Sequence, residues 1–190
     1  MRRLSDPVLP ILPDILEPGL RVVFCGSAAG AVSARVGAYY AGPGNKFWPT
    51  LHAVGLTPRL LAPAEFATLP RYRLGLTDMA KHVSGADAAL PRGSDDPAGL
   101  ARRIRAARPA ILAFTAKRPA RVFLKSQFGL DTVPYGAQPV TLDGIALFVL
   151  PSPSGLACRF WDIGPWHSLA ADARDGDDAA PRRHESKGTA

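Results

Sequence analysis

The sequence predicts an α/β protein, a three-layer α/β/α sandwich with a short central parallel sheet. Two observations lead to this prediction. Apolar runs of strand length alternate along the chain with segments that carry helix-start and helix-stop signals. The first of these runs, over residues 22–24, is β-branched and apolar, which is typical of a buried strand. In such sheets ligands bind beyond the carboxyl ends of the strands, so we expect the loops after Cys25, Met79 and Leu150 to meet at one edge.

The individual elements follow from local signals. Asn45 can cap the first long helix, Asp96 followed by Pro97 is a good helix start, and Pro165 can begin the last helix with Trp166 facing the core. In chain order we expect strands over 21–25 (at the centre of the sheet), 74–79, 110–114 and 145–150, a hairpin turn over 141–145, helices over 46–54, 63–69, 97–108 and 119–128, and a mobile loop over 81–96.

The chain is expected to form one domain with a loose segment at each end. Residues 1–14 carry three prolines and little periodicity, and we interpret them as a flexible N-terminal arm. Residues 15–172 form the predicted domain. Residues 173–190 are charged and poor in apolar side chains, which predicts a disordered tail.

Composition favours a basic protein of the cytoplasm. With 190 residues and 47% apolar content the chain can bury a sizeable core. Its formal net charge of +7 favours polyanionic partners such as nucleic acid, although abundant arginine is also typical of GC-rich coding sequences. Cys25 and Cys158 cannot form a metal set, and the four histidines have no ligand spacing. No apolar run approaches 18 residues and no signal peptide is visible, so we expect no membrane partner, no metal and no other cofactor.

The stretch from Val22 to Trp48 contains the candidate ligand loop. Its strand breaks at Gly26, and Gly30 follows with only small residues between. Such a loop lets backbone N–H groups approach a ligand, because no side chain stands in the way. The spacing is not G-x-G-x-x-G and there is no G-K-[ST] sequence, so a P-loop is excluded and a dinucleotide site fits poorly. By spacing alone an ordinary strand–loop–helix crossover explains the pattern equally well.

Six short segments together resemble the mismatch-specific uracil/thymine-DNA glycosylases of the uracil-DNA glycosylase superfamily. In family order and spacing they are VVFCG at 22–26, the glycine at 30, AGPGNKFW at 41–48, HAVGLTPRLL at 52–61, GLTD at 75–78 and LPSPSGL at 150–156. The resemblance implies the uracil-DNA glycosylase-like fold and removal of a base from DNA. The family's first motif reads G-I-N-P-G, whereas Ser27, Ala28 and Ala29 fill its middle here. Ala28 therefore stands where the relatives have the asparagine that holds the attacking water.

The resemblance also implies a uracil-binding set. The backbone at Ser27 and Tyr40 would hydrogen-bond uracil, and the Tyr40 ring would stack on the base. Asn45 is either a helix cap that shapes the loop or a reader of the base.

Catalysis needs a replacement for the motif asparagine, because the methyl group of Ala28 can neither accept nor donate a proton. Ser27 could orient the water, and Ser33 could help to align it. Asp78, at the end of the second strand, could take the water proton or stabilise the sugar cation. A fourth alternative needs no base, since DNA phosphates can stabilise the cation while backbone donors hold the uracil anion.

The stretch over 152–159 resembles the family's insertion loop. Ser152, Ser154 and the backbone at Gly155 would clamp phosphates. Leu156 would enter the base stack as a wedge, and Arg159 would reach the opposite strand.

These features predict a monofunctional uracil-DNA glycosylase that flips uracil out of DNA and hydrolyses its N-glycosidic bond with water, leaving an abasic site. The expected partner is double-stranded DNA containing uracil, with single-stranded DNA as a second form of substrate. We expect a monomer in the cytoplasm, associated with the nucleoid during repair. Three alternatives stay open: a glycosylase for hypoxanthine or for thymine opposite guanine, a non-catalytic protein that binds uracil or abasic DNA, and an α/β enzyme that acts on a small metabolite.

Overall fold

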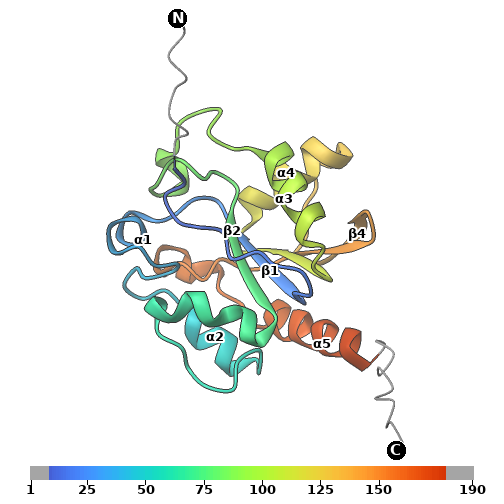
Figure 1. The fold of residues 1–190 in the computed structure, drawn as a ribbon. Helices are drawn as coiled ribbons and strands as arrows, with labels where there is room; N and C mark the ends of the chain where they lie inside the picture. Colours follow the sequence, from blue (N-terminus) through green and yellow to red (C-terminus); the bar gives the residue numbers. More distant parts are fainter. Residues whose placement is uncertain (1–8, 179–190) are drawn as a thin grey trace, which may run out of the picture.

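The computed structural model of the protein describes residues 9–178 and shows a five-stranded sheet with helices on both faces (Figure 1). This arrangement confirms the predicted α/β class. The strands are β1 (Val22–Gly26), β2 (Leu74–Asp78), β3 (Ile111–Phe114), β4 (Gly136–Leu142) and β5 (Ile145–Val149). The α-helices are α1 (Ala31–Val36), α2 (Phe47–Ala53), α3 (Pro97–Ala107), α4 (Lys117–Phe128) and α5 (Gly164–Asp178), and the 3₁₀ segments are η1 (Pro63–Tyr72), η2 (Asp87–Ala89) and η3 (Gly155–Phe160).

The strands lie in the order β2-β1-β3-β5-β4. The pairs β1–β2, β1–β3 and β3–β5 are parallel, whereas β4 is antiparallel to β5 at the edge of the sheet. The sequence places the first strand at the centre of a parallel sheet, but β3 is the middle strand and the sheet is mixed. The predicted hairpin joins β4 to β5, and Asp143 (φ 51°) and Gly144 (φ 87°) take the left-handed conformations that a two-residue hairpin turn needs.

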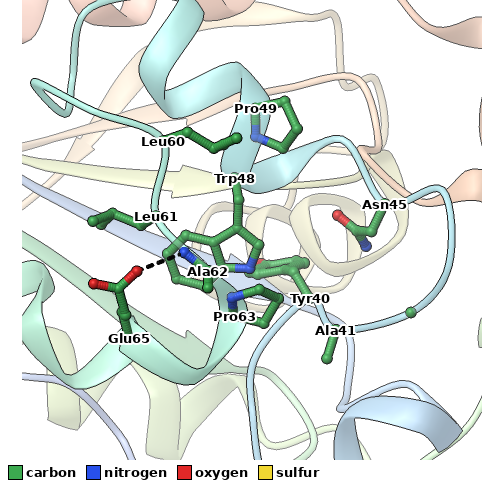
Figure 2. Close-up of a pocket in the computed structure, with 11 residues that line it drawn as sticks. Tyr40, Ala41, Asn45, Trp48, Pro49, Leu60, Leu61, Ala62, Pro63 and Glu65 are labelled. Carbon is green, nitrogen blue, oxygen red and sulfur yellow. Dashed lines mark hydrogen bonds between the residues drawn. The ribbon is translucent and has the colours of Figure 1, made fainter.

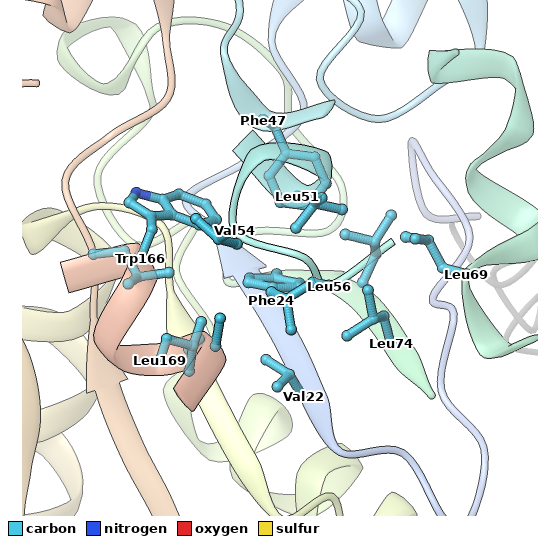
Figure 3. Packing of buried hydrophobic residues seen from close by; sticks show 14 of the residues in the cluster. Val22, Phe24, Phe47, Leu51, Val54, Leu56, Leu69, Leu74, Trp166 and Leu169 are labelled. Carbon is cyan, nitrogen blue, oxygen red and sulfur yellow. The ribbon is translucent and has the colours of Figure 1, made fainter. Parts of the chain in front are cut away.

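The two faces of the sheet bury separate hydrophobic cores, because successive residues of a strand point to opposite faces. Phe24 of β1 joins the core under α2 and α5, and Cys25 joins the core under α3 and α4. Figure 3 shows the first core, where the Phe24 ring meets Phe47 edge-on at 5.2 Å and stacks near Trp166 at 5.8 Å. Trp166 is fully buried, which confirms its predicted core position. The second core contains Leu100, Ile104 and Phe123.

Asp96 caps α3 as predicted, whereas α2 begins at Phe47 with Lys46, rather than Asn45, at the cap position. The Asn45 side-chain oxygen accepts a hydrogen bond from the Phe47 N–H at 2.9 Å, and the Asp96 carboxylate accepts one from the Gly99 N–H at 2.7 Å. Pro97 then occupies the first position of α3, where no amide proton is needed. Among residues 9–178, no helix combines the length and the apolar character that crossing a membrane requires.

The N-terminal segment over 9–14 packs against the domain instead of forming a loose arm. Leu12 is 1% exposed within the first core. Asp14 forms ion pairs with Lys81 at 2.7 Å and Arg103 at 3.2 Å. Burial of an apolar side chain and pairing of a carboxylate outweigh the proline content that suggested a loose segment. Residues 1–8 of the predicted arm lie outside the described residues.

Helix α5 continues to Asp178, past the predicted start of a tail at residue 173. Trp166, Leu169, Ala170 and Ala173 recur at helical spacing, and all four are buried. The apolar stripe therefore extends one turn further than the charged composition indicates. Residues 179–190 of the predicted tail lie outside the described part of the chain.

Candidate functional site

The loops that follow β1 and β2 run side by side at the carboxyl edge of the sheet. The Met79 N–H donates to the Gly26 carbonyl at 2.9 Å, and the Gly85 N–H donates to the Ala29 carbonyl at 2.9 Å. The glycine-bounded loop over 26–30 is therefore framed by the segment after β2. This is the edge at which the sequence predicts a ligand site.

Three polar side chains gather over the end of β1. Gly26 is the register partner of Asp78, and a methyl group added to Gly26 would lie 2.7 Å from an Asp78 carboxylate oxygen and 3.5 Å from the Tyr40 hydroxyl. The Tyr40 hydroxyl is hydrogen-bonded to the Thr115 hydroxyl at 3.1 Å. Sequence reasoning missed Thr115, although it is the first residue after β3 and so reaches the same edge.

Asp78 is a buried carboxyl group with an unusual proton affinity. It is 4% exposed, and burial raises its pKa from the ordinary value of 3.8 to about 7. The charge of Lys81 opposes this rise, while the nearby Asp14 carboxylate adds to it. A carboxyl group that changes its ionisation near neutral pH is suited to proton transfer.

The free energy of unfolding is expected to fall as the pH rises from about 4 to about 7. Over this range the unfolded chain has lost the Asp78 proton, whereas the folded protein still holds it, so folding is favoured most at the acid end. The difference between the two pKa values corresponds to at most about 4 kcal/mol. Urea unfolding across this pH range, compared between the wild type and Asp78→Asn, isolates the contribution. Parallel pH dependences in the two proteins would contradict the expectation.

Tyr40 combines a strained backbone with a ring that is covered on one face. Its φ is 54°, a left-handed conformation that is uncommon for a large side chain and often marks functional positions. Its ring stacks on Phe47 with 3.9 Å between centroids and 16° between planes. Burial raises the pKa of the phenol, which therefore stays protonated.

The two candidate serines differ in whether their hydroxyl groups are already hydrogen-bonded. Ser27 is 7% exposed beside the partly buried Ala28, and its hydroxyl makes no hydrogen bond within residues 9–178. Ser33 is 5% exposed, and its hydroxyl accepts a hydrogen bond from the Ala41 N–H at 3.1 Å. Ser33 therefore holds the segment that follows Tyr40, whereas Ser27 retains a hydroxyl that can bind another group.

A cavity of about 420 Å³ opens beside the loop that precedes α2 (Figure 2). Its walls are mainly apolar and include Trp48, Pro49, Leu60, Leu61 and Pro63. Tyr40 and Asn45 line it, whereas residues 26–30 do not. Tyr40 connects the cavity with the glycine-bounded loop, because it lines the cavity and its hydroxyl lies near Gly26. The Asn45 oxygen accepts from the Phe47 N–H and keeps a second lone pair, and its amide nitrogen can donate to a ligand.

The turn over 151–156 packs directly against the turn over 42–46. The Lys46 N–H donates to the Pro153 carbonyl at 2.8 Å. A methyl group added to Gly155 would lie 2.9 Å from the Pro43 carbonyl oxygen, so only glycine permits this approach. The predicted insertion loop is therefore held at the same edge as the predicted ligand loop.

Leu156 projects from this turn and is 89% exposed. The Ser154 hydroxyl accepts from the Leu156 N–H at 3.3 Å, and the Ser152 hydroxyl accepts from the Ser154 N–H at 3.3 Å. The two serines shape the turn that presents the leucine. Arg159 is exposed on the following 3₁₀ segment.

Lys46 occupies the junction of the two turns and was missed as a site residue. Its ammonium group lies 3.2 Å from the Cys158 sulfur and 5.5 Å from the centre of the Trp161 ring. The signal in the sequence is a basic residue directly after the predicted cap, Asn45. Among the residues that the structure describes, no group of histidine, cysteine and acidic side chains is arranged to hold a metal ion.

Comparison with known families decides the assignment. A family model described as the uracil DNA glycosylase superfamily matches residues 13–171, which include all the loops at the carboxyl edge. The chain belongs to the uracil DNA glycosylase superfamily. Members of this superfamily are hydrolytic glycosylases that act on DNA, which supports DNA as a partner of this protein.

A solved structure agrees with the superfamily fold. The chain is similar to a candidate uracil DNA glycosylase from Methanosarcina acetivorans that was solved by solution NMR. The two share 24% sequence identity with a TM-score of 0.60, and the match covers 86% of this chain and 96% of the other. At this level of identity the likeness to the archaeal protein concerns the fold alone.

Proposed function

We propose that this superfamily member is a monofunctional uracil-DNA glycosylase that acts on duplex DNA. The observation that supports the proposal is the joint placement of the 26–30 loop, Asp78, Tyr40 and the exposed Leu156 at one edge of the sheet. A glycosylase needs donors for the base, a group that handles water, and a side chain that fills the vacated base step. This edge offers a candidate for each.

In the proposed complex, the loop after β1 binds the flipped uracil. Backbone N–H groups at Ser27 and Tyr40 donate to the uracil oxygens, and the ring face of Tyr40 opposite Phe47 stacks on the base. Such stacking contributes about 1–3 kcal/mol. The donors gain strength as negative charge develops on the departing uracil, so they favour the transition state over the substrate.

Bond cleavage then proceeds with water as the nucleophile. The bond between C1′ and N1 breaks, its electron pair leaves with uracil, and the water oxygen bonds to C1′. In our proposal the ionised Asp78 stabilises the sugar cation and accepts the water proton, and Ser27 orients the water. Ser33 acts by holding the segment after Tyr40. Lys46, a lysine within the matched segments, is engaged with Cys158 and Trp161, which agrees with hydrolysis rather than Schiff-base chemistry.

The turn over 152–156 is the proposed DNA contact. Leu156 fills the space that uracil leaves in the stack, and Arg159 reaches the opposite strand. The hydroxyls of Ser152 and Ser154 and the backbone at Gly155 bind phosphates. We propose that the protein belongs with the mismatch-specific uracil/thymine enzymes and that it acts as a monomer without a cofactor. Its proposed location is the cytoplasm, in association with the nucleoid. Further candidate substrates are hypoxanthine, thymine opposite guanine, and uracil in single strands.

A second candidate function is favoured by one observation. Ala28 removes the water-holding asparagine, which is compatible with a protein that binds uracil or abasic DNA without cutting it. Incubation with a uracil-containing duplex, followed by alkali and a denaturing gel, separates the two functions, and we expect cleavage at uracil only. Binding without cleavage would establish the second function. DNA affinity that does not fall with salt would instead favour a metabolite enzyme, because phosphate contacts release counterions.

A further inference from the structure

A buried lysine stands behind the proposed site. Lys81 is 8% exposed, and its ammonium group has three partners: the Leu12 carbonyl at 2.8 Å, the Asp14 carboxylate at 2.7 Å and the Tyr39 hydroxyl at 3.3 Å. These partners use all three of its protons. A buried charge destabilises the folded protein unless it is paired in this way. Lys81 is therefore held in one position by the N-terminal segment.

The Tyr39 hydroxyl connects this lysine to Asp78. It is buried, it accepts a hydrogen bond from the Lys81 ammonium group, and it has a single proton of its own to donate. In the structure the Pro13 carbonyl accepts this hydrogen bond at 3.1 Å. The alternative acceptor is the Asp78 carboxyl group, whose pKa a hydrogen bond from Tyr39 lowers. Burial raises the pKa of Tyr39, so the phenol remains a donor throughout the neutral range.

The direction in which this proton is donated depends on the charge of Asp78. An ionised carboxylate is a stronger acceptor than a carbonyl group, so Tyr39 donates to Asp78 when that group is ionised. When Asp78 is neutral, the Pro13 carbonyl is the better acceptor. Lys81 favours donation from Tyr39 to ionised Asp78 in two ways. Its positive charge stabilises the carboxylate, and its hydrogen bond to the Tyr39 oxygen leaves the Tyr39 proton free for Asp78.

We propose that Lys81, anchored by Asp14, is a positioning residue that sets the protonation of Asp78 through the Tyr39 hydroxyl. The proposal rests on the proposed function, in which ionised Asp78 assists uracil release. The titratable and charged groups around Asp78 are Lys81, Asp14, Arg103, Tyr39, Tyr40 and Cys25. Arg103 donates to the Asp78 main-chain oxygen at 3.0 Å and pairs with Asp14, so it restrains the same strand end from α3.

The test compares Lys81→Met and Tyr39→Phe with the wild type. Two readouts are needed: the titration of the Asp78 carboxyl carbon by NMR, and single-turnover uracil release from a uracil-containing duplex as a function of pH. Removing the lysine charge is expected to raise the Asp78 midpoint by about one pH unit, since an adjacent opposite charge favours ionisation. Tyr39→Phe is expected to raise it by a smaller amount.

In these variants the rate of uracil release should fall only at pH values below the shifted Asp78 midpoint. Below its new midpoint Lys81→Met should release uracil about tenfold more slowly than the wild type, and at alkaline pH the two rates should converge. Lys81→Arg should restore the wild-type midpoint. The matched control is Lys125→Met, which breaks the exposed pair with Asp131 and should leave both readouts unchanged.

Two outcomes would overturn the proposal. One is an Asp78 midpoint that stays in place in both variants, and the other is a loss of rate that is equal at every pH, as a merely structural role predicts. If Lys81→Met does not fold, Tyr39→Phe decides, because it removes only one hydroxyl group. A midpoint that moves in a protein that releases no uracil would support the coupling and contradict the proposed function; the reverse result would contradict the coupling alone.

Discussion

Asp78→Asn is expected to slow uracil release by about 100-fold or more at mildly alkaline pH, where the wild-type carboxyl group is ionised. Asparagine has nearly the same size and fits beside Gly26, but its amide cannot take up a proton from water. It also carries no negative charge to stabilise the sugar cation. Single-turnover release of uracil from duplex DNA measures the effect.

The pH dependence separates this role from damage to the site. Wild-type release should rise as the pH passes about 7, whereas Asp78→Asn should lack that limb. Asp143→Asn is the matched control, because it removes an exposed carboxylate that pairs with Arg105. A rate for Asp78→Asn within threefold of wild type would remove Asp78 from the mechanism and leave the DNA phosphates as the source of stabilisation.

The same substitution is expected to stabilise the protein above neutral pH. A buried carboxylate costs free energy when it ionises, and the neutral amide of the Asp78→Asn variant would carry no such cost. Residues at functional sites often reduce the stability of the folded protein and are nevertheless required for the reaction. Loss of activity together with a gain in stability would be difficult to explain by a structural role.

The strand ends could be predicted from the sequence because their signals are local. The apolar runs that end at Gly26 and Asp78 identify two neighbouring parallel strands, and parallel strands present their carboxyl ends to the same edge. The turn at 152–156 follows a third apolar run, which forms β5, so it also lies at this edge. Placement at one edge therefore follows from topology, without knowledge of any side-chain contact.

The network behind Asp78 could not be predicted, because its members lie far apart in the chain. Asp14 lies in a proline-rich segment and Lys81 in a loop, and neither carries a pattern that relates it to the other. The two adjacent tyrosines have different environments, and nothing in the local sequence indicates which is which. Tyr39 is buried behind the site, whereas Tyr40 has a left-handed backbone conformation and its ring stacks on Phe47. Such contacts depend on how the layers pack, which periodicity does not specify.

The predicted ends of the domain, at residues 15 and 172, are wrong for a related reason. Composition indicated loose ends, but a few well-placed side chains decide whether a segment packs. Leu12 enters the first core, and Ala173 extends the apolar stripe of α5 by one turn. Average composition over ten or twenty residues does not detect such contributions.

Leu156→Ala is expected to slow release from duplex DNA by about 10- to 100-fold, because burying a leucine side chain in the vacated base step contributes about 1.5–3 kcal/mol. The folded protein should not be destabilised, since Leu156 is 89% exposed and contributes nothing to either core. The measurement is single-turnover release from one uracil-containing sequence presented as duplex and as single strand.

Comparison of the two substrates tests the wedge specifically. A single strand has no opposite base and little stacking to disrupt, so it needs no filler and should lose less than about threefold. Leu60→Ala is the matched control, because Leu60 is also exposed, at 55%, but lies at the cavity beside α2 rather than on the turn. Equal losses on both substrates would mean that Leu156 acts on the chemistry and not on the stack. No loss on either would move the DNA-filling role to another part of this edge, and the exposed leucine would need a different explanation.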